Sequence, residues 1–349
     1  MKTSSLRARL GCVLLASIAS IASSGLAQAA VRSWKKIIIP GARCGNGSPY
    51  TAFLSMKDPR KFALELMGGG ACWDRKTCWG PTPLAWIHEI PGLIERLGGF
   101  FSLDLSKTDA ADHTLVHFPY CTGDVHLGRH KARYQAGVPV WHYGAINVER
   151  GLDHLVGTLG FDPYQVGDLT VYGYSAGAIG ALAHIDHFSD LFPAASRRTL
   201  LADAPGLHFG PKFWEKFSPE LLKDYAEAIR RAGHELDTSQ GMLAKFVSTV
   251  CERHPGWEIG VMQGSKDVVM SALFGAISPD DHHRSIFGPE GLWEQTRDVS
   301  DNCSAWIPTS TVHTFMVSDP TAEIRAGQQN AYEFLNGLMR AISRDNHRD

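Results

Sequence analysis

The sequence lacks several features that would place it in a special class of protein. After the first 30 residues it has no apolar run long enough to cross a bilayer, which argues against stable membrane insertion. Its net charge is only −2, so electrostatics give no reason to expect nucleic acid or an anionic membrane as a partner. No internal repeat, low-complexity tract or heptad run is present, which excludes solenoids and coiled coils.

Two common site motifs are also missing. The cysteines include no C-x-x-C pair, so a zinc site is not indicated. The triple glycine at residues 68–70 is not followed by Gly-Lys-Ser/Thr, which argues against a phosphate-binding loop. Hydrophobic residues make up 44% of the chain and charged residues 20%, as is typical of a packed globular protein.

The N-terminus has the pattern of a signal peptide. Three basic residues within the first nine positions precede an apolar run over residues 10–21, and Ala27-Gln28-Ala29 suits signal peptidase. The apolar run is shorter than a bilayer span. We therefore expect residues 1–29 to be removed and residues 30–349 to form a single domain in a secreted or periplasmic protein.

Cysteine usage agrees with export. Outside the signal peptide the chain keeps an even number of cysteines, which in an exported protein predicts disulfides. They are Cys44, Cys72, Cys78, Cys121, Cys251 and Cys303. Spacing does not select the pairing, but the short interval between Cys72 and Cys78 favours a local bond, and Cys251 with Cys303 is a second expectation.

Short apolar runs alternate with helical patterns along the chain. Strand-like runs cover residues 36–40, 62–67, 114–118, 169–172, 199–202, 259–262 and 311–316, and helical patterns cover residues 146–159, 219–232 and 328–342. This alternation predicts an α/β fold with a doubly wound, mostly parallel sheet. Residues 206–257 form an insertion rich in helix formers and aromatics, which suits either a cap over the site or a helical layer on the sheet.

Residues 168–180 read as a strand, a sharp turn and a helix. The turn Gly173-Tyr174-Ser175-Ala176-Gly177 fits the G-x-S-x-G nucleophile elbow. Small neighbours let the strand and the helix pack closely while the serine Oγ projects above the sheet. We therefore predict that Ser175 is a nucleophile and that the amide of Ala176 points at a developing oxyanion.

A serine nucleophile needs a base and a carboxylate, and in this type of fold they follow in the order Ser, acid, His. Asp267 comes after the strand-like run 259–262 and a Gly-Ser-Lys turn, which places it at the carboxyl end of a strand. His313 follows and completes the order. Asp203, one strand earlier, is the alternative acid, or it caps the turn that follows it.

The other histidines fit structural roles better. His117, His126 and His208 fall outside the expected order and are predicted to be structural or pocket residues. His282 and His283 lie in a stretch rich in Asp and Arg, which reads as a solvated loop.

The second part of the oxyanion hole is expected on a loop after an early strand. Residues 66–73 read Leu-Met-Gly-Gly-Gly-Ala-Cys-Trp and follow the run 62–67. Glycines there expose successive amides without obstruction by side chains, as in the HGGG-type loops of esterases.

Four segments together make the chain resemble the pectin acetylesterase family, which includes the Notum lipid deacylases. They are residues 66–73, residues 117–126 (His-Phe-Pro-Tyr-Cys-Thr-Gly-Asp-Val-His), the elbow at 173–177 with the helix that starts at Gly144, and residues 202–206 (Ala-Asp-Ala-Pro-Gly). The resemblance covers about residues 40–320.

The resemblance implies an extracellular α/β-hydrolase fold with neither a metal nor an organic cofactor. Carried over residue by residue, it implies a triad of Ser175, Asp267 and His313. The backbone amides of Gly69, Gly70 and Ala176 would then donate to the oxyanion.

The implied substrate is an acetylated polysaccharide, cleaved by a secreted serine carboxylesterase. Met67, Ala71 and Tyr174 depart from plant members, which typically have an acidic residue, Trp and Cys there, so acyl preference stays open. A deacylase for longer or lipid acyl esters is the alternative, since the insertion is apolar. A catalytically silent relative that binds glycans or a protein is another. Three tryptophans are candidates either to stack on sugar rings or to fill the core: Trp73, Trp79 and Trp214.

Overall fold

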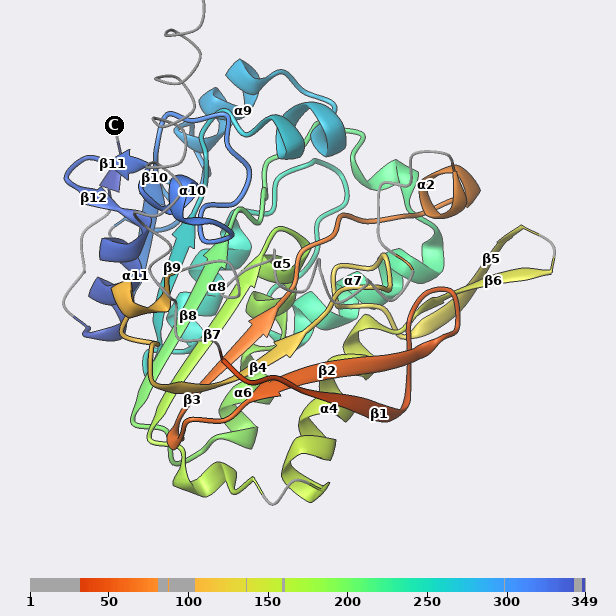
Figure 1. The fold of residues 1–349 in the computed structure, drawn as a ribbon. Helices are drawn as coiled ribbons and strands as arrows, with labels where there is room; N and C mark the ends of the chain where they lie inside the picture. The colour runs from red at the N-terminus through yellow and green to blue at the C-terminus, as the bar shows by residue number, and fades with distance from the viewer. Residues whose placement is uncertain are drawn as a thin grey trace, which may run out of the picture. The chain divides into compact units, whose positions relative to one another are not determined.

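The computed structural model describes residues 32–80, 87, 104–135, 137–158, 161–297, 299–341 and 347–348. The expected signal peptide, residues 1–29, lies outside the described residues. The described residues from Trp34 onward form one compact unit (Figure 1). Within the described ranges, none of the helices combines the length and the apolar character that crossing a membrane requires.

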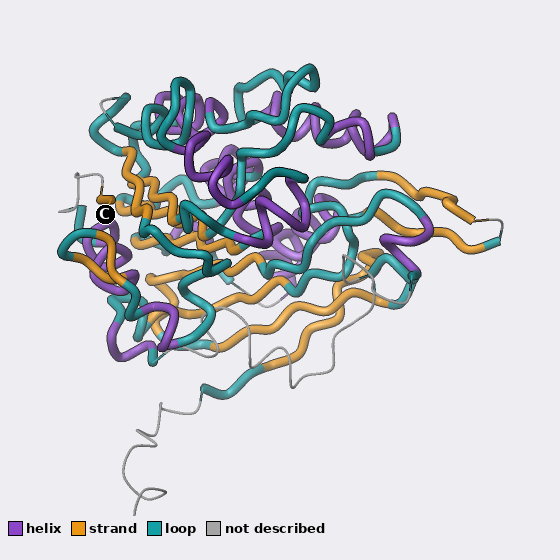
Figure 2. Tube along the Cα trace, turned by 90° about the horizontal axis from the view of Figure 1, so that it is seen from above, coloured by secondary structure: helices purple, strands orange, loops and turns teal. Residues whose placement is uncertain are grey.

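A mixed sheet runs through this unit, and Figure 2 shows its strands lying side by side with helices packed around them. The strands that the structure describes in it are ordered β1-β2-β4-β3-β7-β8-β9-β10-β13. Their bounds are β1 Lys35–Arg43, β2 Pro49–Ser55, β3 Asp58–Leu66, β4 His113–Phe118, β7 Asp168–Tyr174, β8 Arg197–Asp203, β9 Glu258–Met262, β10 Cys303–Ile307 and β13 His347–Arg348. Strand β2 pairs antiparallel with β1 and β4, and the remaining pairs are parallel. The predicted α/β fold with a mostly parallel sheet is confirmed.

Helices cover both faces of the sheet. Their bounds are α2 Arg75–Trp79, α4 Gly144–Thr158, α5 Ala176–Ala183, α6 Ile185–Leu191, α7 Pro219–Arg231, α8 Lys245–Arg253, α9 Pro279–Ile286, α10 Asp319–Ala322 and α11 Ala331–Met339. Leu200 and Ala202 of β8 pack in the same core as α4 and α5, whereas Leu201 packs with α11. Successive side chains of a strand point to opposite faces, so a strand covered on both sides is apolar throughout.

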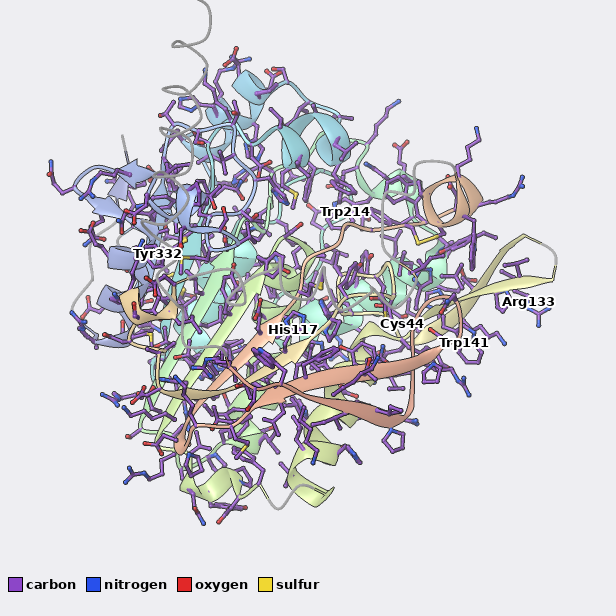
Figure 3. All side chains as sticks on the ribbon, in the orientation of Figure 1. Cys44, His117, Arg133, Trp141, Trp214 and Tyr332 are labelled. Carbon is purple, nitrogen blue, oxygen red and sulfur yellow. A yellow bond between two sulfur atoms is a disulfide. The ribbon has the colours of Figure 1, made fainter. Side chains whose placement is uncertain are left out.

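Two segments leave the sheet. The hairpin of β5 (His130–Gln135) and β6 (Val138–His142) protrudes from the body, and Figure 3 shows Arg133 on it. The insertion at residues 206–257 contains α7, α8 and the short 3₁₀ helix η4 (Trp214–Lys216). Trp214 is only 5% exposed, so it belongs to the core and does not form a surface platform for a sugar.

The predicted strand at residues 311–316 is wrong. These residues form a loop, and the strand in this region is β10, which the sequence did not indicate. The backbone amides that a strand would use are already bound, because Phe315 and Met316 donate theirs to the carboxylate of Asp203. An amide bound to a side chain cannot take part in a strand ladder.

The solvated loop predicted around His282 and His283 is also wrong. Both histidines lie on α9, which Ser278 caps through its hydroxyl. His282 is fully buried, with Nδ1 2.9 Å from the carbonyl oxygen of Ser265, and Nδ1 of His283 lies 3.0 Å from the hydroxyl of the same serine.

Three disulfides lie within the described residues. They join Cys44 to Cys121, Cys72 to Cys78 and Cys251 to Cys303. The two pairs expected from the sequence are confirmed, and the third follows from the remaining cysteines.

Candidate active site

Ser175 stands on the turn between β7 and α5. Its φ of 53° and ψ of −122° are sterically unfavourable for a residue with a Cβ, at a cost of about 1–3 kcal/mol. The turn is held because Ser175 donates its amide to the carbonyl of Asp203 at 2.8 Å. Space is also limiting: a Cβ at Gly177 would lie 2.0 Å from the carbonyl oxygen of Leu66, and one at Gly173 would lie 2.1 Å from that of Gly177. Only glycine fits at positions 173 and 177, and this allows the sharp turn of the elbow.

Ser175 opens into an apolar cavity of about 60 Å³. Gly70 and Ala176 line the cavity beside the serine. By the measure that one water needs roughly 10–15 Å³, the cavity has room for several water-sized groups. Much of its wall comes from the insertion, through Phe209, Phe213, Trp214, Phe217, Tyr225 and Ile229.

The insertion is held against the loop that follows Gly70. The ring of Phe217 lies 5.3 Å from that of Trp73, and Phe213 packs edge-on against Phe217. The Nζ of Lys216 lies 5.1 Å from the Trp73 ring centre and donates to the carbonyl of Phe274 at 2.5 Å. Burial lowers the pKa of Lys216. The insertion thus forms a packed wall of the cavity.

Asp267 follows β9 and is fully buried. Its Oδ1 accepts the amides of Val269 and Met270 at 2.9 and 3.0 Å. Its Oδ2 lies 2.7 Å from Nδ1 of His313. Since a carboxylate only accepts hydrogen bonds, Nδ1 of His313 donates to it, and in the neutral imidazole Nε2 is then the nitrogen with the lone pair.

Gln263 is a partner of this pair that the sequence analysis missed. Its Nε2 donates to Oδ2 of Asp267 at 3.1 Å, and its Oε1 accepts the amide of Gly206 at 2.9 Å. The one available signal was its position directly after β9, at the sheet edge where Asp267 was expected.

Asp203, the alternative acid, is placed differently. It is fully buried at the end of β8, and its carboxylate accepts the amides of Phe315 and Met316 and the hydroxyl of Tyr172. Nδ1 of His313 donates its hydrogen bond to Asp267 instead. Burial raises the pKa of Asp203 to about 6, and the two backbone amides oppose that rise.

The glycine loop is braced by two side chains from residues 117–126. The Tyr120 hydroxyl donates to the carbonyl of Gly70 and accepts the amide of Val125, both at 2.8 Å. His126 donates from Nε2 to the carbonyl of Met67 at 2.8 Å. Burial lowers the pKa of His126 to about 3, so it is a neutral structural histidine, as predicted. The sequence analysis assigned no role to Tyr120.

The structure brings the predicted residues together in two groups. Gly70, Ser175 and Ala176 share the cavity lining, and Asp267 and His313 share a hydrogen bond. Gly69 and His313 are not among the described residues that line the cavity. No metal-like gathering of three or more His, Cys, Asp or Glu side chains occurs in the part of the chain that the structure describes.

Comparison with known proteins agrees with this geometry. The family model described as pectinacetylesterase matches residues 29–212, more than half of the chain. The matched region contains the glycine loop, the elbow and Asp203, and it ends before Asp267 and His313. A search of curated proteins finds no match to this chain. The chain belongs to the pectinacetylesterase family, and this membership implies a carboxylic ester hydrolase.

Proposed function

We propose that the chain is an exported serine carboxylesterase that removes acetyl groups from polysaccharide. The observation that carries the proposal is the hydrogen bond between Asp267 and His313, which leaves Nε2 of His313 free to act as a base. Strands β7 and β9 both run parallel to β8, so their carboxyl ends lie at the same edge of the sheet. Ser175 follows β7 and Asp267 follows β9, which brings the Asp267–His313 pair to the sheet edge where Ser175 stands.

In the acylation step, Nε2 of His313 takes the proton of the Ser175 hydroxyl while its Oγ attacks the ester carbonyl. The electron pair of the C=O bond moves to oxygen, and the amides of Gly69, Gly70 and Ala176 stabilise this oxyanion. When the carbonyl re-forms, the C–O bond to the alcohol breaks and His313 donates its proton to the leaving oxygen. Asp267 stabilises the imidazolium throughout.

In the deacylation step, water replaces the alcohol. His313 takes a proton from the water as it attacks the acyl-serine, and the tetrahedral intermediate collapses with return of that proton to Oγ of Ser175. The products are a carboxylic acid and free enzyme, so no cofactor enters the balance.

Two acyl preferences follow from different observations. The limited cavity volume and the family favour an acetyl group on a polysaccharide. The aromatic wall built by the insertion favours a longer acyl chain, because burying the apolar surface of that chain against the wall would stabilise the complex. A deacylase for longer acyl or lipid esters is therefore the second candidate.

A series of p-nitrophenyl esters from acetate to palmitate tests both candidates. We expect wild-type turnover to be highest with acetate and to fall about 10⁶-fold in Ser175→Ala, as in other triads that lose the nucleophile. Ser196→Ala is the matched control, because this exposed serine precedes β8 at the opposite sheet edge. Release of acetate from acetylated pectin or xylan would then identify the polymer.

Other outcomes are equally informative. Highest turnover with long chains would replace the deacetylase with the second candidate. Turnover that survives in Ser175→Ala would overturn the serine mechanism, and no turnover by the wild type would favour a binding protein that lacks catalysis.

Export is tested separately. The three disulfides and the family favour an extracytoplasmic protein. We expect the mature protein recovered outside the cytoplasm to begin at Ala30, which N-terminal sequencing measures. A mature protein that still begins at Met1 would contradict the proposed signal peptide.

A further inference from the structure

Asp203 contacts both halves of the candidate site. Its backbone carbonyl accepts the amide of Ser175 at 2.8 Å. Its carboxylate accepts the amides of Phe315 and Met316 at 2.8 Å each, two and three residues after His313. The function proposed above gives the side chain no role.

The carboxylate of Asp203 is buried and its hydrogen bonds are satisfied by protein donors. Asp203 is fully buried, and Tyr172 adds a third donor from the neighbouring strand at 3.1 Å. A buried carboxylate is unfavourable unless hydrogen bonds satisfy it, and here backbone amides supply most of them. A simple turn cap would have bonded to the residues that follow Asp203, not to a loop 112 positions away.

The loop that carries His313 depends on this acceptor. It has left the sheet, and Thr314 has a φ of 69°, a conformation that a β-branched residue rarely adopts. Phe315 is buried, so its amide would lack both a strand partner and water if the carboxylate were absent. The backbone on the C-terminal side of His313 is therefore fixed through Asp203.

The same strand end also reaches the acid. Gly206 donates its amide to Gln263, and Gln263 in turn donates to Asp267. Residues 203–206 are thus connected by hydrogen bonds to the backbone of Ser175, to the loop that carries His313 and, through Gln263, to Asp267.

We propose that Asp203 is a positioning residue, which sets the place of the His313 base relative to Ser175. It acts through the loop backbone, because the partners of its carboxylate are the amides of Phe315 and Met316 and the hydroxyl of Tyr172. This inference rests on the proposed serine mechanism and deepens it.

The first test is Asp203→Asn, a change of similar shape. Either orientation of the new amide puts an NH₂ group against the amide of Phe315, since both carboxylate oxygens accept from it. We expect kcat per active site to fall about 10- to 100-fold, the effect of a catalytic group displaced by about 1 Å. KM should change less than about threefold, because the cavity lining is untouched.

Kinetics per active site separate positioning from stability. Burst titration with a p-nitrophenyl ester counts working sites, so a merely destabilised protein would show fewer sites with wild-type kcat. Asp168→Asn is the matched control, since this carboxylate begins β7 at the opposite sheet edge and pairs with Arg197. We expect its kcat per site to equal that of the wild type.

Two kinetic results would overturn the proposal: wild-type kcat per site in Asp203→Asn, or a loss as large as that of Asp267→Asn, which would make Asp203 the acid. If Asp203→Asn does not fold, hydrogen exchange on the wild type decides, because the amides of Phe315 and Met316 must be protected; exchange as fast as that of exposed loops would contradict the role. Activity that survives in Ser175→Ala would reject the proposed function instead, whatever Asp203→Asn does.

Discussion

Ser175 stands on a turn that glycines two residues away on either side make sterically possible, whereas His313 stands on a loop whose Phe315 amide is bound by a carboxylate 112 positions away. On the serine side, Gly173 and Gly177 create the space and the following helix begins at once. On the histidine side, buried carboxylates replace local chain geometry. The comparison shows that one site can be assembled by a local motif and by long-range hydrogen bonds together.

The difference predicts how each side fails. A local turn fails by steric conflict, which appears mainly as lost stability. A loop held by distant carboxylates fails by displacement of the base, which appears mainly as lost kcat. The following changes test that division, beginning with the largest expected effect.

Asp267→Asn should lower kcat about 10⁴-fold, because the amide no longer holds the imidazole in the tautomer with Nδ1 protonated. The measurement is ester turnover per active site. Asp280→Asn, at an exposed carboxylate on α9, is the control and should leave turnover unchanged. Loss of less than tenfold would mean that another group orients His313.

Gly177→Ala should destabilise the protein by about 3 kcal/mol, since its methyl group would meet the Leu66 carbonyl and force the elbow to shift. Denaturant unfolding measures this. Gly157→Ala in α4 is the control, because beyond its chain neighbours and its own helix backbone no described atom lies within 4 Å of the added Cβ, and it should be neutral or stabilising. Equal stability of both variants would show that the elbow is not sterically limited.

Acid should destabilise the fold between pH 6 and 4, and six buried groups together contribute roughly 3 kcal/mol per pH unit near pH 5. Burial lowers the pKa of His126, His142 and His208 to about 3 and that of His184 to about 4. These histidines therefore add stability above their unfolded pKa, and it is lost as the pH falls because the unfolded chain takes up protons that the fold excludes.

Two carboxylates oppose this trend. Burial raises the pKa of Asp124 and Asp203 to about 6, so their contribution is favourable below the unfolded value and is lost as the pH rises through 6. For these six groups together, unfolding near pH 5 takes up about two protons net. Unfolding free energies at pH 7, 6, 5 and 4 measure the slope, and a flat profile would contradict the neutral buried histidines.

Tyr120→Phe should have the smallest effect, about 1 kcal/mol of stability and a few-fold in kcat, because the glycine loop loses one hydroxyl partner. Tyr164→Phe is the control, at a side chain that is 72% exposed. A loss of kcat as large as that of Asp203→Asn would mean that the serine side also depends on distant contacts.

The sequence predicts the parts of the site that form locally better than the parts that depend on distant contacts. The elbow was predictable because its glycine spacing is a local steric requirement, and the expected strand, turn and helix are β7, Ser175 and α5. The order Ser, acid, His placed Asp267 and His313, and the structure joins them by a hydrogen bond. The roles of Gln263 and Tyr120 were not predictable, since each depends on partners that only the fold brings near.

The errors have a physical cause as well. Residues 311–316 carry β-branched and apolar side chains typical of a strand, yet Asp203 takes the amides that a strand would need. Strand β10 begins with Cys303 and Ser304, which are buried without being strongly apolar. Its burial comes from the disulfide and from sheet neighbours, and neither leaves a periodic signal.

The disulfide pattern bears on how such a chain could mature. The Cys72–Cys78 loop lies inside the Cys44–Cys121 loop, and the Cys251–Cys303 loop lies wholly after both, so none of the three interlace. A chain that emerges N-terminus first exposes Cys44 before Cys72 and Cys78, so Cys44 must stay reduced until Cys121 follows, or an early Cys44–Cys72 bond must be undone. The Cys251–Cys303 pair can form between consecutive cysteines, whereas the Cys44–Cys121 pair is the place where an isomerase would be needed if the first thiols to meet reacted.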